Sequence, residues 1–373
     1  MSNIKILFLT KYGKIGASSR LRTLQYIDYF AKNKIECAVS SLIFDRTLSN
    51  KYVAGRYEFK DLFFLYARRV LALLNRDKYD VLWIEKEAFP WIPFFVEKML
   101  LKGIPYVLDY DDAIYHHYDE HRFTVVRYLY GSRLDNLMAG ASLVTVGNNY
   151  LAARAQSAGS RWIECVPTVV DLSRYPLKPS YPKSGPIPII VWIGSPSTTR
   201  YLEILRQPLK KLSENYMFKF RVIGADNFEL ENVDVESLPW AENTEVTLLN
   251  GCDIGVMPLH NSNWELGKCG YKLIQYMASY LPVVASPVGV NSDIVSHGKN
   301  GFLAESGEDW FDFLSILLDD LELRTQLGLN GRLLVESRYS LQRQAPRLEQ
   351  MLRKVASKRR NCTNIHHEQR TRG

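Results

Sequence analysis

The amino-acid sequence predicts an α/β protein made of two doubly wound, Rossmann-like domains. Its 373 residues exceed one ordinary hydrophobic core and suit two domains of about 150 to 200 residues. Short β-rich runs alternate with helical runs along the chain, which is typical of parallel sheets covered by helices. A segment that holds five of the sixteen prolines, residues 171–188, interrupts this alternation and is expected to be the linker between the domains.

The first domain is expected over residues 1–170. A Gly-containing loop and an amphipathic stretch from Ser18 to Lys32 follow its first strand, and an acidic loop follows its third. The four strands predicted for this domain are residues 4–10, 79–84, 104–108 and 142–146.

The second domain is expected over residues 189–340, with one helix from Thr199 and another that ends near Tyr280. A C-terminal helix, residues 341–357, is expected to return to the first domain. The basic tail, residues 358–373, has no apolar pattern and is expected to be disordered. The strands predicted for the second domain are residues 189–193, 218–223, 253–257 and 282–285.

Composition narrows the class of protein. Apolar residues make up 46% of the chain and charged residues 23%, as in soluble globular proteins, and no apolar run approaches the roughly 18 residues of a membrane span. We therefore expect a cytoplasmic protein. Its five cysteines are scattered without CxxC spacing, so we expect reduced thiols and no zinc site. The net charge of +7 suits nucleic acid, an anionic membrane or a nucleotide diphosphate.

Ligands of open α/β sheets bind where loops leave the carboxyl ends of strands. In the first domain, the loop around Gly16 suits either a phosphate cradle, with Arg20 and Arg22 beside it, or a plain turn; the absence of GxGxxG disfavours an ordinary NAD site. The carboxylates of residues 109–112 follow a strand. Because like charges there disfavour one another's ionised forms, we expect a proton acceptor, a metal or a hydroxylated ligand. Asp109 and Asp111 also spell a DxD pair.

In the second domain, residues 194–200 resemble either an anion-binding helix start or a well-capped structural helix. The strongest signal is residues 264–275. Two glycines flank Lys268 just before a helix, Lys272 lies four residues farther, and Gln275 lies one turn beyond, where it would reach a ribose hydroxyl. We expect a diphosphate at this helix start.

The stretch KLIQYMASYLPVVAS, residues 272–286, resembles the "LEAMASGLPVVAS" helix and strand of the family 4 (group 1) retaining glycosyltransferases of the GT-B fold, of the bacterial surface-polysaccharide type. Residues 287–303 are similar to that family's "GGxPEIVxDGxxGFLV". The resemblance covers roughly residues 189–339. It implies two Rossmann-like domains with a cleft between them, a nucleotide-sugar donor site in the second domain and an acceptor site in the first.

The same resemblance implies transfer of a sugar from a nucleotide-diphosphate donor to a saccharide or lipid-linked saccharide, in the biosynthesis of polysaccharide such as lipopolysaccharide. No cofactor and no strict metal requirement are expected. The chain departs from the family's Glu-x7-Glu pattern: Gly267 and Gln275 occupy those two positions, and Glu265 lies two residues too early. The family's phosphate-binding Arg and Lys fall on Ser195 and Arg200, so Lys268 is expected to replace the missing charge.

The family's histidine falls on Asp111, which we expect to contact the acceptor or the donor sugar and, with the donor phosphate, to assist the acceptor proton. Residues assigned to donor binding are Gly16, Gly194, Ser195, Gly267, Lys268, Cys269 and Gln275, and those assigned to catalysis are Asp111, Arg200 and Lys272.

Two other functions remain open. One is a sugar-nucleotide epimerase of similar two-domain fold. The other is a non-enzymatic basic protein that binds nucleic acid or membrane, although no nucleic-acid motif is present and we expect no nucleic-acid partner.

An anionic membrane is a further expected partner. Residues 63–76 and 89–102 place aromatics and leucines beside basic residues, which suits either a bilayer interface or helices packed on the first sheet. We expect peripheral attachment at the cytoplasmic face of the inner membrane.

Overall fold

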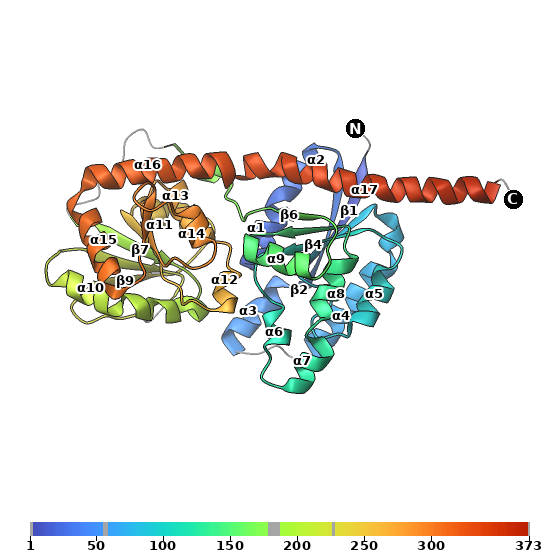
Figure 1. Ribbon diagram of the computed structural model, residues 1–373, viewed down its shortest axis with the longest axis horizontal. Helices are drawn as coiled ribbons and strands as arrows, with labels where there is room; N and C mark the ends of the chain where they lie inside the picture. The colour runs from blue at the N-terminus through green and yellow to red at the C-terminus, as the bar shows by residue number, and fades with distance from the viewer. Residues whose placement is uncertain (1–2, 55–58, 178–186, 226–227, 372–373) are drawn as a thin grey trace. The chain divides into compact units, whose positions relative to one another are not determined.

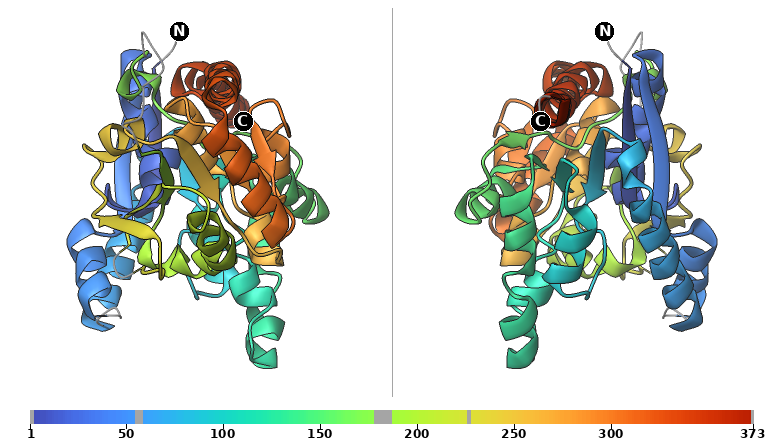
Figure 2. Two further views of the ribbon diagram at one scale, coloured as in Figure 1. Left: turned by 90° about the vertical axis from the view of Figure 1, so that its left-hand side faces the viewer. Right: turned by 90° about the vertical axis from the view of Figure 1, so that its right-hand side faces the viewer.

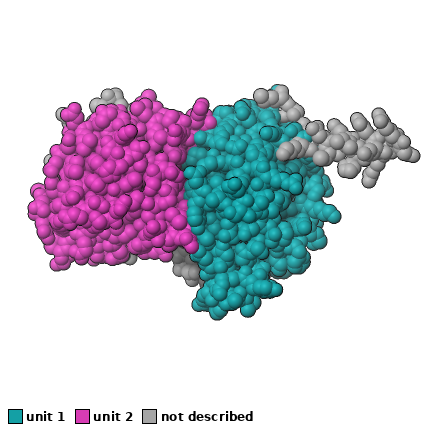
Figure 3. Space-filling view, in the orientation of Figure 1, with its two compact units in different colours: residues 1–168, 344–373 teal, residues 169–343 magenta. Residues whose placement is uncertain are grey.

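The computed structural model describes the backbone of residues 3–54, 59–177, 187–225 and 228–371 (Figure 1). The chain forms two compact units (Figure 3). Unit 1 comprises residues 1–168 and 344–373, and unit 2 comprises residues 169–343. Half of the expected linker, residues 178–186, lies outside the described residues.

Unit 1 is built on a six-stranded sheet in the order β2-β1-β3-β4-β5-β6, in which every neighbouring pair is parallel. A doubly wound sheet of this kind needs a crossover between successive strands, and helical segments supply it. The strands are β1 (Ile4–Tyr12), β2 (Ile35–Ile43), β3 (Val81–Glu85), β4 (Tyr106–Tyr110), β5 (Leu143–Val146) and β6 (Ile163–Cys165).

The helices of unit 1 connect and cover these strands, and Figure 2 shows them from two sides. They are α1 (Ala17–Arg22), η1 (Leu24–Tyr26), α2 (Ile27–Lys32), α3 (Asp45–Ala54), α4 (Phe59–Leu74), η2 (Arg76–Lys78), α5 (Phe94–Leu101), α6 (His116–Asp119), α7 (Thr124–Tyr130), α8 (Arg133–Gly140) and α9 (Asn149–Ser157). None of the helices in the described part of the chain is long and apolar enough to cross a bilayer.

Unit 2 has a second six-stranded parallel sheet, in the order β12-β11-β10-β7-β8-β9. Counted from β7, this is the 3-2-1-4-5-6 order of dinucleotide-binding folds. The α/β class with two doubly wound units is therefore confirmed. The strands are β7 (Ile189–Ile193), β8 (Lys219–Ile223), β9 (Asp234–Leu238), β10 (Ile254–Met257), β11 (Val283–Ala285) and β12 (Gly301–Leu303).

Both faces of the unit 2 sheet are buried. Along β7, Ile190 and Trp192 belong to one hydrophobic cluster and Val191 and Ile193 to another, as the period of two in a strand requires. The helical elements of this unit are η3 (Leu172–Arg174), η4 (Pro196–Leu205), α10 (Arg206–Ser213), α11 (Glu245–Asn250), α12 (Asn263–Leu266), α13 (Tyr271–Ala278), α14 (Asn291–Ile294), α15 (Gly307–Asp319) and α16 (Leu321–Arg338).

The last helix, α17 (Leu341–Thr371), groups with unit 1 from Gln344 onward. Within unit 1, Arg347 of this helix pairs with Glu164 at 2.6 Å, and Tyr29 donates to Glu349 at 3.1 Å. The helix extends beyond residue 357, into the range we expected to be disordered. After Pro346 the sequence contains no glycine or proline before residue 372, so nothing in it ends the helix earlier.

Two sequence expectations in unit 1 need correction. The helix expected from Ser18 to Lys32 is broken at Thr23, whose φ of −130° and ψ of −61° are not helical. Asp109 does not lie in a loop, because β4 continues to Tyr110. Asp109 is therefore a buried strand residue, and the acidic loop begins only at Asp111.

Candidate functional site

The strand orders place one candidate site in each unit. In a doubly wound sheet, ligands bind at the carboxyl edge where the strand order reverses. In unit 2 this point lies between β7 and β10, and in unit 1 between β1 and β3. The loops that carry our predicted residues leave these strand ends.

In unit 2, β7 runs into a tight turn at Gly194. A Cβ atom there would meet the ring of Trp192 at 2.4 Å and the Thr198 hydroxyl at 2.8 Å, so no side chain fits. Thr198 Oγ1 accepts a hydrogen bond from the Ser195 backbone N–H at 3.2 Å, and the Ser195 side chain is exposed. The turn is a capped helix start, and Ser195 is accessible in it.

Arg200 reaches the second loop of this site. Its Nη2 lies 3.1 Å from the Glu265 carboxylate and 3.0 Å from the Tyr201 hydroxyl. Glu265 is buried and also accepts hydrogen bonds from Tyr201 and Ser262. Burial alone would raise the pKa of Glu265, but the Ser262 and Tyr201 hydrogen bonds and the Arg200 charge lower it. Glu265 is thus a fixed anion that holds Arg200 at the carboxyl end of the sheet.

Two lysines lie beside this network. The Lys268 ammonium is 5.0 Å from the Trp264 ring centroid, and the Lys272 ammonium is 4.5 Å from that of Trp192. Burial, with a further contribution from Lys268, lowers the pKa of Lys272 to about 7. A bound anion would favour the charged form of Lys272 and offset the repulsion from Lys268, so this pair of lysines is suited to bind an anion.

The glycines before α13 shape its start. Gly270 caps the helix with a φ of +64°, which favours glycine, and a Cβ atom there would have to displace the Cδ1 atom of Ile294, which it would meet at 2.4 Å. The first N–H groups of α13 have no partner within the helix and add a positive end to the two lysines. Gly267 ends α12 and Cys269 is buried, so both can contribute only backbone to a ligand.

Gln275 differs in its surroundings from the lysines. It is 3% exposed. Burial raises the pKa of the neighbouring Tyr175, and a side-chain hydrogen bond with Gln275 opposes that rise. The side chain is therefore more enclosed than a residue exposed to bind ribose would be.

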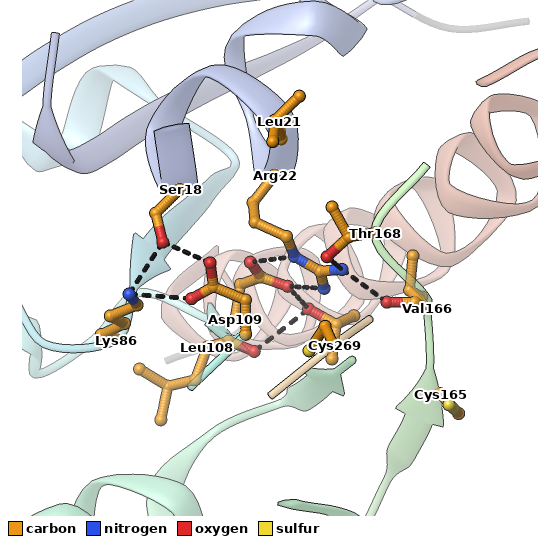
Figure 4. A network of polar contacts seen from close by, with 12 residues as sticks. Ser18, Leu21, Arg22, Lys86, Leu108, Asp109, Cys165, Val166, Thr168 and Cys269 are labelled. Carbon is orange, nitrogen blue, oxygen red and sulfur yellow. Dashed lines mark hydrogen bonds and ion pairs between the residues drawn. The ribbon is translucent and has the colours of Figure 1, made fainter. Parts of the chain in front are cut away.

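In unit 1, the carboxylate of Asp109 is fully engaged (Figure 4). Arg22 binds it through two nitrogens, at 3.0 and 2.6 Å, and Thr145 donates to it at 2.7 Å. Arg22 also donates to the Val166 carbonyl at 2.6 Å. Arg20 donates to the Lys14 carbonyl. Both guanidinium groups thus have acceptors within the protein, which favours the plain turn over the phosphate cradle at the loop after β1.

Asp111 lies at the accessible end of the same network. Lys86 binds it at 2.8 Å and Asp112 at 3.5 Å, and Lys86 also donates to Ser18 at 2.8 Å, which in turn donates to Asp111. Burial would raise the pKa of Asp111, but the Lys86 and Arg22 charges lower it. Lys86 has a φ of +63°, a backbone conformation that residues other than glycine rarely adopt, and these contacts hold its Nζ atom in place.

The turn at Gly16 is held together by contacts of its own. A Cβ atom on Gly16 would meet Tyr12 at 2.3 Å. Ser19 accepts from the Tyr12 N–H at 2.9 Å and donates to the buried Glu85. The hydroxyl groups of Ser18 and Ser19 are thus both engaged by carboxylates, which favours the turn over a phosphate cradle at this loop.

The two carboxylates of the DxD pair are bound by Arg22 and Lys86. One other group among the described residues has ligand atoms within 4.8 Å of one another: His116, Asp119 and Glu120. In that group Asp119 also pairs with Arg154 at 2.9 Å.

Sequence reasoning missed four residues that build these sites: Tyr201, Ser262, Trp192 and Lys86. A signal for Ser262 existed, because Ser262-Asn-Trp-Glu265 is the S-x-x-E pattern of a capping box. Lys86 lies two residues after the strand predicted over residues 79–84, which was a second signal. No local pattern shows that Trp192 would support both Gly194 and Lys272.

The chain was compared with known proteins. The family model described as glycosyl transferases group 1 matches residues 187–320. Over 173 residues the chain is 30% identical to the capsular polysaccharide biosynthesis glycosyltransferase CapM of Staphylococcus aureus, an alignment that covers 41% of this chain and 43% of that protein. It is also 30% identical over 122 residues to the D-inositol 3-phosphate glycosyltransferase of Pseudarthrobacter chlorophenolicus, over 32% of this chain and 28% of that protein. The chain thus spans less than half the length of these curated relatives.

Solved structures share the fold over nearly the whole chain. The Anabaena protein HepE, in complex with UDP-glucose, superposes with a TM-score of 0.68 and 17% identity over 95% of this chain and all of that protein.

Proposed function

We propose that the chain, whose residues 187–320 match the group 1 glycosyltransferases, transfers a sugar from a nucleotide-diphosphate donor to a saccharide or lipid-linked saccharide acceptor, with retention of anomeric configuration. The likeness to a capsular polysaccharide enzyme supports a role in surface-polysaccharide biosynthesis, of a capsule or a lipopolysaccharide. We place the reaction in the cytoplasm, at the membrane face argued below.

The observation that carries the proposal is the pair of lysines before and within α13. Lys268 and Lys272 lie at the carboxyl edge of a sheet with dinucleotide-binding strand order, beside a helix start capped by Gly270 at positive φ. Lys272 is partly buried, and this burial lowers its pKa. A diphosphate would therefore bind there without a further large desolvation of that lysine.

These cations also suit the chemistry. Cleavage of the bond between sugar and phosphate moves negative charge onto the diphosphate, so Arg200, Lys268 and Lys272 would stabilise the transition state more than the bound donor. Ser195 and the backbone of Gly194 would add hydrogen-bond donors from the loop that follows β7.

We propose that Asp111 orients a sugar hydroxyl. Its lowered pKa makes it a weak proton acceptor, so the departing phosphate would take the acceptor proton while Asp111 accepts a hydrogen bond. Lys86 and Ser18 would hold the carboxylate in position for that contact.

Calorimetric titration with a panel of nucleotide sugars tests donor binding, and UDP-glucose is the first probe because HepE was solved with it. Transfer is then assayed with saccharide and lipid-linked acceptors, and NMR of the product determines the anomeric configuration. An isomerised donor formed without acceptor would indicate an epimerase instead. Absence of binding by every nucleotide sugar would overturn the proposal.

Donor affinity is expected to fall as pH rises above about 7. In the free protein Lys272, with a pKa of about 7, is cationic below that pH and neutral above it, whereas a bound diphosphate would raise this pKa. Binding above pH 7 must then take up a proton, so the dissociation constant should rise up to about tenfold per pH unit. Calorimetry from pH 6 to 9 measures this slope. Lys272→Arg should bind with no such slope, and an unchanged slope in that variant would assign the pH dependence to another group.

Sugar transfer is expected to persist in EDTA, because Arg22 and Lys86 occupy the carboxylates of the DxD pair. The measurement is initial rate with EDTA and with added Mn²⁺. If EDTA abolished transfer and Mn²⁺ restored it, the group formed by His116, Asp119 and Glu120 would become the candidate, and His116→Ala would test it.

A further inference from the structure

Helix α4 exposes an apolar face. Phe63 and Phe64 are 73% and 63% exposed, and Leu71 and Leu74 are 61% and 58% exposed, with the exposed Ala67 between them. Their spacing of i, i+1, i+4, i+8 and i+11 places them on one side of the helix. The buried residues of α4 lie on the opposite side of the helix. Helix α4 is thus apolar on its packed side and on its solvent side, which packing against the sheet does not explain.

The segment that leads into α5 continues this exposed surface. Trp91, Phe95 and Met99 are 48%, 70% and 65% exposed, and the exposed Lys98 and Lys102 lie next to them. Helices α4 and α5 contact each other, and the Tyr66 and Phe89 rings lie 6.0 Å apart between them. The two exposed faces therefore belong to neighbouring elements of unit 1.

Helix α7 is the third element. It has no buried residue, and Val125, Tyr128 and Leu129 are exposed, as is Phe123 just before it. The Trp91 ring lies 6.1 Å from that of Tyr130, so α7 adjoins the start of α5. Figure 1 shows α4, α5 and α7 in the same part of unit 1, and Figure 2 shows α7 standing clear of the sheet. We call the exposed apolar side chains among residues 63–74, 91–99 and 123–129 the apolar face.

The exposed charges among the residues of the apolar face are basic, and acidic residues lie at its ends, at Asp61 and Glu120. Residues 62–76 and 121–134 contain no aspartate or glutamate; Arg122 and Arg127 there are exposed, whereas Arg69 and Arg133 are buried. Residues 89–102 contain one acid, Glu97, which is buried and paired with Arg133. Basic groups therefore border exposed aromatics and leucines without acidic groups among them.

We propose that the apolar face docks on an anionic lipid bilayer, with the aromatic and leucine side chains among the acyl chains and the basic groups at the headgroups. Contiguous exposed apolar surface on three neighbouring elements marks an interaction surface. The absence of exposed acids between these residues fits a uniformly anionic partner, and tryptophan and tyrosine suit the bilayer interface, where one end of the ring is apolar and the other is wet. This inference does not depend on sugar transfer.

The test is sedimentation of the purified full-length chain with vesicles of phosphatidylethanolamine, with and without phosphatidylglycerol. Binding is expected with phosphatidylglycerol and should weaken at high salt. Phe63→Ser with Phe64→Ser, and separately Tyr128→Ser with Leu129→Ser, should each weaken binding by about tenfold or more, because less apolar surface enters the bilayer. Met217→Ser with Leu333→Ser, in unit 2, is the matched control and should leave vesicle binding unchanged.

Three results would overturn the docking proposal: no sedimentation with either vesicle, equal binding by all the variants, or a dimer in analytical ultracentrifugation that the Phe63 and Phe64 substitutions abolish, which would make a second copy the partner. Calorimetry with UDP-glucose on the same variants separates the two proposals. UDP-glucose binding should be unchanged in these variants. If the parent protein itself did not bind UDP-glucose, the proposed function would be contradicted and the bilayer result would be unaffected.

Discussion

Replacing Lys272 with methionine is expected to weaken nucleotide-sugar binding by roughly 10- to 150-fold at pH 7, since a hydrogen bond to a charged group contributes about 1.5–3 kcal/mol. Methionine keeps an apolar stem over Trp192 and removes only the cation, so packing around the turn at Gly194 should survive. The effect is expected to be larger than at Lys268, because Lys272 is the lysine whose desolvation lowers its pKa. Calorimetry with UDP-glucose is the measurement.

Two variants make this result interpretable. Lys272→Arg should retain most of the affinity, because it keeps a cation at the helix start. Lys210→Met removes an exposed lysine of the same unit, which pairs only loosely with Glu231 at 3.5 Å, and should bind like the parent. Equal affinity of the parent and Lys272→Met would show that the diphosphate does not bind at the start of α13.

The interior strands of both sheets were predictable from sequence, whereas all four missing strands lie at sheet edges. β1, β3, β4 and β5, like β7, β8, β10 and β11, are found where continuous apolar runs predicted them. β2, β6, β9 and β12 end the two sheets. An edge strand pairs on one side only and is partly solvated. β9, Asp-Val-Glu-Ser-Leu, accordingly has no buried residue and too little apolar pattern to be recognised.

The candidate site was predictable where chemistry is local in sequence. Gly270 and Lys272 share one turn of chain, so spacing alone indicated a helix start with a cation. The fate of Arg22 was not predictable, because its partner Asp109 lies on another strand and only the fold brings the two together. The spacing of apolar residues likewise cannot distinguish a helix that is apolar only on its packed side from one, such as α4, that is apolar on both sides.

Unit 1 also contains a buried charge cluster that a tertiary contact creates. Arg133 is 2% exposed and pairs with Glu87 and Glu97, and it donates to the Phe89 and Ile92 carbonyls at 2.6 Å each. Burial raises the pKa of Glu97 to about 7, although Arg133 opposes that rise. One guanidinium therefore compensates two buried carboxylates that connect the end of β3, α5 and α8.

Arg133→Met is expected to destabilise unit 1 by about 3–5 kcal/mol at pH 8, because it leaves two buried carboxylates without their cation. The loss should be smaller near pH 5. Without Arg133 the folded-state pKa of Glu97 rises further above its unfolded value, so the folded state binds more protons and stability falls as pH increases. Urea denaturation, with hydrogen exchange at β3 and β4 amides to report unit 1 separately, measures both effects. Arg206→Met is the control, since Arg206 pairs with Glu203 on the surface and should contribute less than about 1 kcal/mol. A loss at Arg133 no larger than at Arg206, or one independent of pH, would show that the carboxylates do not depend on this guanidinium.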